Sequence, residues 1–273
     1  MIIVINYADK RFKKTQKLNS RTARKWGADM VISYNREDMD EEYIRKNEQI
    51  LKGSIGGGFF VWKPYFIKKT YNQMQEGDYL FYIDSGAVCV DRIQHLINCM
   101  EKEQMDVMVF SLENERLEKQ FTKRDTFLLM NCDSPKYTDT PQVLAGYMIF
   151  KKTDFASKFI DEWLYYAQDA RISTTMENTL GLPNYEGFVA NRTQSVPSLL
   201  AKKYGLKIFR DPSQFGVIHH YPKDIEERSS YPQIIDSHRM RKVRYLWQIP
   251  INRNKYVQML KYKIYLWKKA REK

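Results

Sequence analysis

Short apolar runs alternate with helix-patterned segments along the first half of the chain, and this alternation constrains the fold more than any other feature. The runs lie at residues 1–6, 30–34, 79–83 and 107–110, and the run at 79–83 has the length expected for a strand buried on both faces. The segments between them have helical spacing and lie at residues 14–27, 41–52, 64–74 and 92–104. Such alternation predicts an α/β fold with a mostly parallel central sheet flanked by helices.

The second half of the chain is less regular. We expect a strand at residues 144–150 and helices at 154–169 and 194–204. From residue 253, Val257, Leu260, Ile264 and Trp267 recur at helical spacing among lysines. We therefore expect one domain over residues 1–240 and a basic, amphipathic helical extension over residues 241–273.

The sequence favours a cytoplasmic location. No run of about 18 apolar residues is present, so no membrane-spanning helix is expected. The first residues lack the pattern of a signal peptide and resemble a strand that begins at once. The three cysteines are odd in number and lack metal-ligand spacing, as expected for thiols in a reducing compartment.

The positive charge is concentrated at one end of the chain. Residues 241–273 contain eleven Lys or Arg and one Glu, which is +10 of the formal net charge of +12. A general nucleic-acid binder would spread its charge over the folded domain and carry a binding motif. We expect no nucleic-acid partner.

Asp84 is the strongest local signal for chemistry, because it ends a buried apolar run and precedes Ser85 and Gly86. Ligands of open parallel sheets bind beyond the carboxyl ends of strands. A carboxylate there suits a cation that bridges to a diphosphate. The alternative is that Asp84 caps a helix or a turn.

A glycine-rich turn at residues 56–58 precedes Trp62, Lys63 and Pro64. Its spacing fits neither a dinucleotide fingerprint nor a P-loop. Pro64 suits a helix start, and Lys63 beside it offers a cation for a phosphate. The alternative is that Trp62 is part of the core and Lys63 is solvated.

Several blocks of sequence occur in an order that is more specific than any one of them. A Gly-Gly-Gly-Phe-Phe-Val-Trp-Lys-Pro-Tyr block stands at residues 56–65, and Gly-Asp-x-Leu-x-Tyr-x-Asp-x-Gly stands at 77–86. The remaining blocks lie at residues 122–127, 142–146, 192–204 and 238–241. Together they resemble a family of bacterial capsular polysaccharide and lipopolysaccharide glycosyltransferases.

The resemblance implies an A-type glycosyltransferase fold that uses a nucleotide sugar, with UDP as the expected nucleotide. Asp84 would begin the Asp-x-Asp metal motif of such enzymes, but Gly86 replaces the second carboxylate. His238 or His220 would supply the histidine that such enzymes bring to the metal, so the implied ligands of Mn²⁺ or Mg²⁺ are Asp84, His220 and His238.

The donor-sugar segments look like those of retaining galactosyltransferases and glycogenin-like enzymes. Gln194 would face the anomeric carbon, and Thr193 stands where those enzymes carry an acid. The resemblance further assigns donor contacts to Tyr7, Ala8, Asp9, Trp62, Lys63, Ser85, Gly86, Gln142, Ala145, Gly146, Arg192, His238 and Arg239.

The basic extension suggests that the enzyme binds a membrane surface. A helix with interleaved aromatic residues and lysines suits the interface of an anionic membrane, where a lipid-linked acceptor would lie. This predicts a peripheral enzyme at the inner face of the plasma membrane. The alternative is a helix that packs its apolar side on the domain.

Two other functions remain open at this point. The first is a catalytically weakened relative that binds a nucleotide or glycan, which Gly86 and Thr193 suggest. The second is a basic membrane-binding adaptor in which the α/β body is only a scaffold. Which sugar, acceptor and linkage are used does not follow from these residues.

Overall fold

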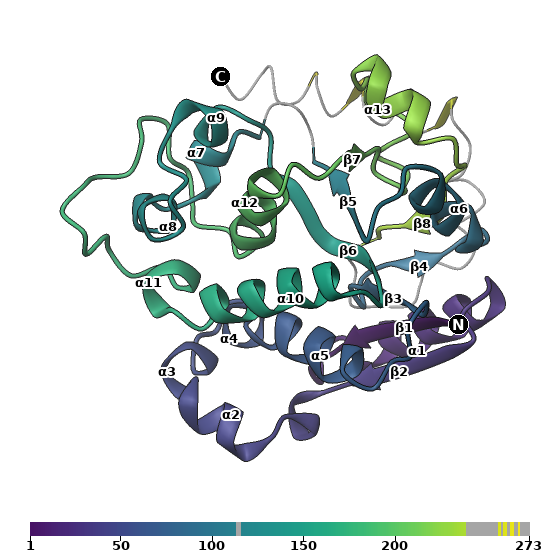
Figure 1. Cartoon of the computed structure of the whole chain (residues 1–273), viewed down its shortest axis with the longest axis horizontal. Helices are drawn as coiled ribbons and strands as arrows, with labels where there is room; N and C mark the ends of the chain where they lie inside the picture. The colour runs from purple at the N-terminus through teal and green to yellow at the C-terminus, as the bar shows by residue number, and fades with distance from the viewer. Residues whose placement is uncertain (113–115, 239–255, 258, 261–262, 265–266, 268–273) are drawn as a thin grey trace.

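A six-stranded sheet in the order β2-β1-β3-β6-β5-β7 forms the centre of the molecule (Figure 1). The computed structural model describes residues 1–112, 116–238, 256–257, 259–260, 263–264 and 267. The strands of this sheet are β1 (Ile2–Tyr7), β2 (Met30–Tyr34), β3 (Tyr79–Ile83), β5 (Val107–Ser111), β6 (Val143–Lys151) and β7 (Ile208–Phe209).

Five of these strands run in one direction, and β6 runs against them. β1 pairs in parallel with β2 and β3, and β5 pairs in parallel with β7. β6 is antiparallel to both of its neighbours, β3 and β5. The predicted α/β fold with a mostly parallel sheet is confirmed.

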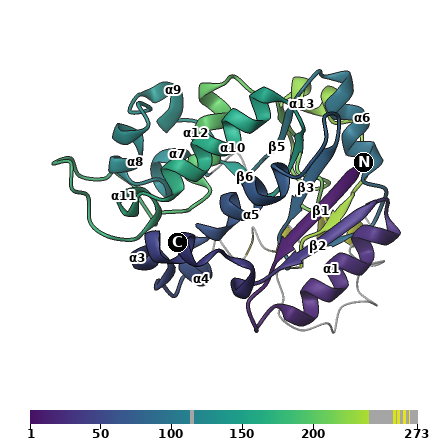
Figure 2. The ribbon, with the colours of Figure 1, turned by 60° about the horizontal axis from the view of Figure 1, so that its bottom comes forward.

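Helices cover both faces of the sheet, as Figures 1 and 2 show from two directions. Those already expected from spacing are α1 (Lys13–Lys25), α2 (Glu41–Lys46), α3 (Glu48–Leu51), α5 (Trp62–Tyr71), α6 (Gln94–Lys102), α10 (Asp154–Ala167) and α12 (Ser195–Lys203). The short elements that complete the chain are α4 (Gly56–Phe59), α7 (Glu118–Phe121), α8 (Arg124–Leu129), α9 (Pro135–Thr138), α11 (Ala170–Ser173) and α13 (Lys223–Arg228), with a 3₁₀ turn at Arg36–Asp38.

Alternation along the buried strands divides the core into two layers. In β1, Ile3 and Ile5 join the core that α5, α10 and α12 cover, whereas Ile2 and Val4 join the core that α1 and α6 cover. Successive side chains of a strand point to opposite faces. A continuous apolar run therefore needs a helical layer on each face, which the structure supplies.

The ends of the predicted helices differ from the observed ones by up to three residues, and one predicted helix is broken. The expected helix at 41–52 is broken at Asn47, which is the C-cap residue of α2 and the N-cap residue of α3. Its side-chain amide donates to the Tyr43 carbonyl (3.0 Å) and to Gln168 (3.2 Å), so it is fixed between elements. α5 begins at Trp62, two residues before Pro64.

A second, two-stranded sheet joins the end of the described domain to the segment that follows β3. β4 (Val88–Cys89) pairs antiparallel with β8 (Ile235–Asp236). No helix among the described residues is both long and apolar enough to cross a membrane. Most of residues 241–273 lie outside the described residues, so the boundary at residue 240 stays a prediction.

Candidate functional site

The carboxyl ends of β1 and β3 open into a hollow of about 430 Å³, which we call the β1–β3 pocket. Its walls come from the strand ends, the glycine-rich turn, the start of α5 and the middle of β6. The residues that line it include Tyr7, Ala8, Asp9, Arg11, Phe12, Gly56, Gly57, Phe60, Trp62, Asp84, Ser85, Gly86, Gly146 and Ser237. Eight of the predicted donor contacts lie here: Tyr7, Ala8, Asp9, Trp62, Asp84, Ser85, Gly86 and Gly146.

Hydrogen bonds join three strands at the floor of the pocket. The Ser85 hydroxyl donates to the Tyr7 carbonyl (2.6 Å), which links the ends of β3 and β1. The Asp84 amide donates to the Gly146 carbonyl (2.8 Å), which links β3 to β6. These bonds hold the residues after β3 in a fixed place, so the Asp84 side chain is presented from a rigid edge.

Two aromatic rings form a flat wall of the pocket. Tyr7 and Trp62 stack with their centroids 3.8 Å apart and an interplanar angle of 21°. The Trp62 indole donates to the Gly56 carbonyl (2.8 Å), and burial raises the pKa of the Tyr7 hydroxyl. The rings are thus locked by packing and hydrogen bonding, and both side chains, although largely buried, line the pocket.

The glycine-rich turn that supports this wall is left-handed. Gly56, Gly57 and Gly58 have φ values of 58°, 68° and 101°. Phe59 and Phe60 follow at φ 48° and 58°, a conformation that residues with side chains rarely adopt. A Cβ at Gly58 would stand 2.7 Å from the Leu51 Cα, so glycine is required there by both conformation and space.

Lys63 lies directly behind Asp84. Its ammonium is 3.1 Å from Asp84 Oδ1 and donates to the Ala145 carbonyl (2.8 Å). Its side chain is 7% exposed, whereas that of Asp84 is 42% exposed. The ring of Tyr82 lies 4.7 Å from the same ammonium. Lys63 does not itself line the pocket and lies behind Asp84, so its predicted contact with a ligand stays a prediction.

Tyr82 completes this cluster by donating its hydroxyl to Asp84 Oδ1. Burial, and then the neighbouring Asp84 charge, raise the pKa of Tyr82 well above its ordinary value, so the hydroxyl stays protonated and keeps donating. Asp84 Oδ1 therefore has two partners on the protein side. Asp84 Oδ2 faces Gly146, where an added Cβ would lie 3.3 Å away.

The described residues do not form a protein metal site. Nowhere in residues 1–112 and 116–238 do three His, Cys, Asp or Glu side chains gather in a metal-binding group. Asp84 is held by Lys63 and Tyr82, and His220 is exposed and does not line the pocket. The expectation that Asp84, His220 and His238 share Mn²⁺ or Mg²⁺ has no support in this geometry.

His238 and Arg239 are the other two predicted contacts at the end of the domain. His238 follows Ser237, which lines the pocket, and burial lowers the pKa of its imidazole. Its ring is therefore more readily neutral at pH 7 than that of an exposed histidine. Arg239 lies outside the described residues.

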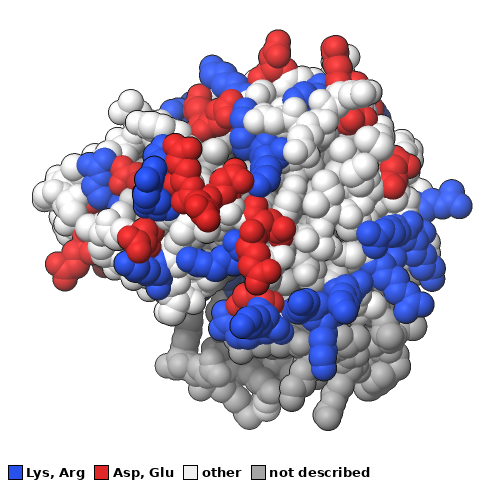
Figure 3. All heavy atoms as spheres, turned by 90° about the horizontal axis from the view of Figure 1, so that it is seen from below, with Lys and Arg blue, Asp and Glu red and all other residues white. Residues whose placement is uncertain are grey.

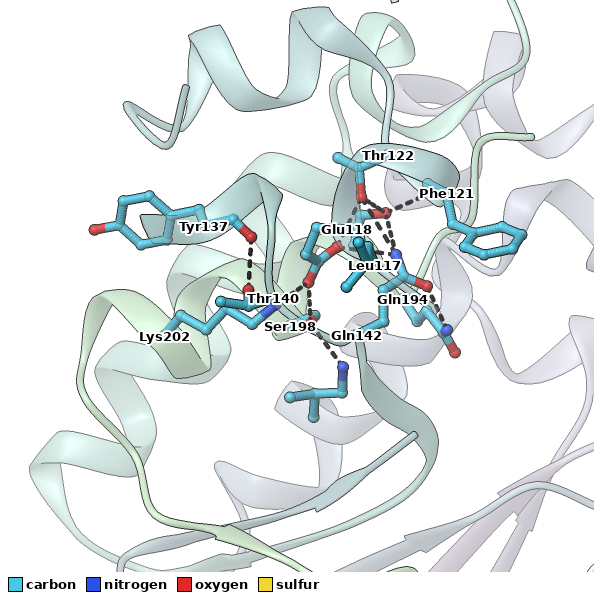
Figure 4. A network of polar contacts seen from close by, with 12 residues as sticks. Leu117, Glu118, Phe121, Thr122, Tyr137, Thr140, Gln142, Gln194, Ser198 and Lys202 are labelled. Carbon is cyan, nitrogen blue, oxygen red and sulfur yellow. Dashed lines mark hydrogen bonds and ion pairs between the residues drawn. The ribbon is translucent and has the colours of Figure 1, made fainter. Parts of the chain in front are cut away.

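Gln194 belongs to a buried polar network, drawn in Figure 4. The Gln194 amide donates to the Gln142 side-chain oxygen (2.7 Å). The Gln142 amide in turn donates to Glu118 (3.0 Å). Lys202 contacts the other oxygen of Glu118 (2.7 Å), and Ser198 donates to the same atom. Gln142 thus orients Gln194 instead of lining the pocket.

Glu118 is the centre of this network and was missed by the sequence reasoning. Its side chain is 0% exposed, and besides Gln142, Ser198 and Lys202 it accepts from Thr122 (2.8 Å). Burial lowers the pKa of its partner Lys202. One signal was available: Ser198 and Lys202 are four residues apart on the expected helix and so share one face.

Thr193 and Arg192 lie next to Gln194 but face different surroundings. Thr193, Lys63 and Ala145 line a small cavity of about 20 Å³, beside Phe60 of the pocket wall. The Arg192 amide donates to the Phe121 carbonyl (2.8 Å), and its guanidinium lies 5.8 Å from the Phe121 ring. Thr193 therefore lines the same small cavity as Lys63, the partner of Asp84, and Arg192 lies against Phe121 of α7.

Comparisons with known proteins find distant structural similarities. No family model matches the chain, and no curated protein sequence matches it. Mouse xyloside xylosyltransferase 1 is 9% identical, with 86% of this chain and 96% of that chain covered and a TM-score of 0.45. The galactosyltransferase LgtC with donor and acceptor sugar analogues is 11% identical, with 86% of each chain covered and a TM-score of 0.46. An active-site mutant of LgtC is 10% identical over the same shares, also with a TM-score of 0.46. These are distant similarities that extend over most of the chain.

Proposed function

We propose that this chain is a glycosyltransferase that binds a nucleotide sugar in the β1–β3 pocket and transfers the sugar to a glycan or lipid-linked glycan. One observation carries the proposal: the pocket at the carboxyl ends of two parallel strands joins an aromatic wall to the Lys63–Asp84 pair. Ligands of open α/β sheets bind at such strand ends. A volume of about 430 Å³ falls within the usual range for small-molecule sites.

The nucleotide base would lie against the Tyr7–Trp62 wall. A base stacked on an aromatic ring contributes about 1–3 kcal/mol by alanine substitution. Ala8 and Asp9 also line the pocket, and the Asp9 carboxylate is held by an ion pair with Arg11 at 2.6 Å. Arg11, which no motif singled out, adds a cation at the pocket edge.

The diphosphate and the sugar would then extend toward Asp84 and Gly146. Lys63 neutralises Asp84 Oδ1, so a negatively charged diphosphate can approach the exposed side of this carboxylate with less repulsion. Gly146 carries no side chain where the ligand would pass between β6 and Asp84. Ser85 and Gly86 supply the backbone after β3.

Transfer requires a stabilised leaving group and an acceptor hydroxyl held close to the anomeric carbon. The Gln194 side chain, oriented by Gln142, is the residue we assign to the face of the anomeric carbon. Arg192, Ala145, His238 and Arg239 are the further donor contacts that the resemblance suggests. UDP as the nucleotide, retention of configuration and a role in capsule or lipopolysaccharide synthesis at the cytoplasmic face are parts of the same proposal.

Calorimetric titration with UDP tests the site, with and without Mn²⁺, on the wild type and on Asp84→Asn. Asp161→Asn is the matched control, because Asp161 also pairs with a lysine, Lys68 at 2.7 Å, but lies on α10. We expect UDP binding that Asp84→Asn alters and Asp161→Asn does not. Absence of binding to UDP and to other nucleotides would refute the donor site. A large gain in affinity with Mn²⁺ would support a metal at Asp84.

One observation favours a second candidate, a weakened relative that binds nucleotide sugars without efficient transfer. Thr193 lies beside the Lys63–Ala145 contact, where related enzymes carry an acid for sugar recognition. Hydrolysis of UDP-sugars distinguishes the two candidates: binding without any release of UDP favours the weakened relative. A membrane adaptor would instead tolerate Asp84→Asn and lose its function when residues 241–273 are removed.

A further inference from the structure

Helix α1 and its lead-in carry an unusual concentration of positive charge. Eight cations occur within residues 10–28, and the same stretch contains no Asp or Glu. All eight are exposed. They define the α1 basic face: Lys10, Arg11, Lys13, Lys14, Lys17, Arg21, Arg24 and Lys25. This surface is distinct from the basic extension at residues 241–273.

The packing of α1 fixes which side faces outward. Gln16 donates to the Tyr34 carbonyl (2.8 Å), and Asn19 donates to the Ala87 carbonyl (2.8 Å). Both side chains are buried, as are Leu18 and Ala23. The helix therefore cannot rotate about its axis, and its outer side presents almost only Lys and Arg. Figure 3 shows this side as a band of Lys and Arg with little Asp or Glu among them.

The charges of this face are largely left without opposite charges. Within the described part of the chain, Arg11 is the one member that forms an ion pair, with Asp9 at 2.6 Å. Lys25 lies over the Trp26 ring at 5.1 Å, and Arg24 donates to the Val31 carbonyl at 3.4 Å. Like charges at this density repel one another, so the face is stabilised by an anionic surface.

Exposed apolar side chains flank one end of the face, and the pocket flanks the other. Met1 is 52% exposed and Met30 is 45% exposed, at the starts of the neighbouring strands β1 and β2. Arg11 and Phe12, just before α1, line the β1–β3 pocket. A helix of 13 residues spans about 20 Å between these two ends.

We propose that the α1 basic face docks on an anionic membrane surface, with Met1 and Met30 entering the headgroup region. A flat array of cations beside exposed apolar side chains fits a bilayer interface. Nucleic acid fits less well, because Gln16 and Asn19, the amide side chains of α1 that suit contacts to bases, are buried. Docking by this face places the pocket edge beside the bilayer, within reach of a lipid-linked acceptor; this last step rests on the proposed function.

Co-sedimentation of the full-length chain with vesicles tests the proposal. The vesicles are phosphatidylcholine alone or phosphatidylcholine with phosphatidylglycerol. The variant Lys13→Gln, Lys17→Gln, Arg21→Gln removes three charges from one side of α1. The control Lys46→Gln, Lys136→Gln, Lys158→Gln removes three exposed charges from α2, α9 and α10. Thermal unfolding establishes that each variant is folded.

We expect wild type and control to bind the anionic vesicles, salt to weaken binding, and the α1 variant to bind on the order of 100-fold more weakly. Equal vesicle binding by the α1 variant and the control would overturn the proposal. So would single-stranded RNA that binds the α1 face more tightly than the vesicles do. UDP titration without vesicles is expected to be the same in all three proteins, so failure of docking and failure of the donor site are distinguishable.

Discussion

At the scale of residues, the Lys63–Asp84 pair decides what the pocket can bind. A lone carboxylate at a diphosphate site repels the ligand unless a cation lies between them. Here the Lys63 ammonium already lies 3.1 Å from Asp84 Oδ1 and is held by the Ala145 carbonyl. The described residues supply no further acid or histidine to make a three-ligand metal group. At the proposed donor site, this fixed ammonium would take over part of the role of a divalent cation.

This arrangement predicts that UDP binds the wild type with similar affinity in EDTA and in Mn²⁺. Lys63→Gln leaves the Asp84 charge without its partner, and we expect it to weaken UDP binding at least tenfold in EDTA. Added Mn²⁺ would then restore part of the affinity. Lys68→Gln, which removes the partner of Asp161 on the surface, is the control. Calorimetry measures all of these, and a wild type that binds only with Mn²⁺ contradicts the prediction.

Asp211 predicts a pH-dependent stability. It is fully buried, and burial raises its pKa above the ordinary 3.8 even though Tyr147 (2.9 Å) and the Ser213 amide (2.7 Å) donate to it. A pKa that is higher in the folded chain means a stabilising contribution that is complete below about 3.8 and lost as pH rises through the folded value. Asp211→Asn removes this loss.

We therefore expect the Tm of Asp211→Asn, measured relative to the Tm of the wild type, to increase as pH rises from acid to neutral. The asparagine oxygen still accepts from Tyr147 and Ser213, so the comparison isolates the charge. Thermal unfolding across that pH range measures the difference. A constant difference at every pH would show that the Asp211 charge has no part in it.

At the scale of elements, the left-handed segment at residues 56–60 holds the aromatic wall in place. Gly58→Ala places a Cβ 2.7 Å from the Leu51 Cα at φ 101°. Gly77→Ala is the control, because Gly77 has φ 82° and open space around it. Both variants carry the cost of a left-handed residue, about 1–2 kcal/mol, and Gly58→Ala adds the collision. Urea unfolding should show the larger loss for Gly58→Ala, and equal losses would contradict the collision.

Glu118, on α7, joins this helix to two other elements, because its partners include Gln142, which directly precedes β6, and Ser198 and Lys202 on α12. Glu118→Gln leaves Lys202 buried without its counter-charge, and breaking a buried pair costs about 3–5 kcal/mol. Glu103→Gln, at the more exposed pair with Lys207, should cost less than about 1 kcal/mol. Urea unfolding measures both. The double variant Glu118→Gln, Lys202→Met should regain part of the loss, and no regain would mean that the pair is not the cause.

Much of the element order was predictable from sequence. The runs at 30–34 and 79–83 match β2 and β3, because short, mostly apolar runs between turn signals admit few other structures. The reversed direction of β6 was not predictable, since an apolar run is the same in both directions. Short elements such as α7 and α11 escaped because four residues show no helical period.

The pocket could be predicted in part for the same physical reason. The strand ends at Tyr7 and Asp84 meet because parallel neighbours end at one edge. The depth of Lys63 behind Asp84 depends on how α5 packs on the sheet, which no local pattern encodes. The residues around Glu118 in the sequence do not mark it as buried, because acidic residues at a helix start are usually exposed and favoured there, and the spacing of Ser198 and Lys202 does not name their acidic partner.

At the scale of the whole molecule, charge is divided between the α1 basic face and residues 241–273. The extension contributes +10, and the rest of the chain is close to neutral overall. The α1 basic face is nevertheless strongly positive, so acids elsewhere must balance it. Two positive segments of one chain can bind one membrane with effects that multiply, because each cation near the surface adds about 1 kcal/mol.

Removal of residues 241–273 tests this division, and with it the predicted boundary at residue 240. All strands of both sheets and helices α1–α13 lie before residue 241, so we expect unfolding and UDP titration to stay close to the wild type. Vesicle binding should fall, and adding the three α1 substitutions to the truncation should abolish it. If truncation alone abolishes binding and the α1 substitutions change nothing, the extension is the membrane anchor and α1 is not. If truncation unfolds the chain, the extension belongs to the domain, because its apolar residues then contribute to the core and not to a surface.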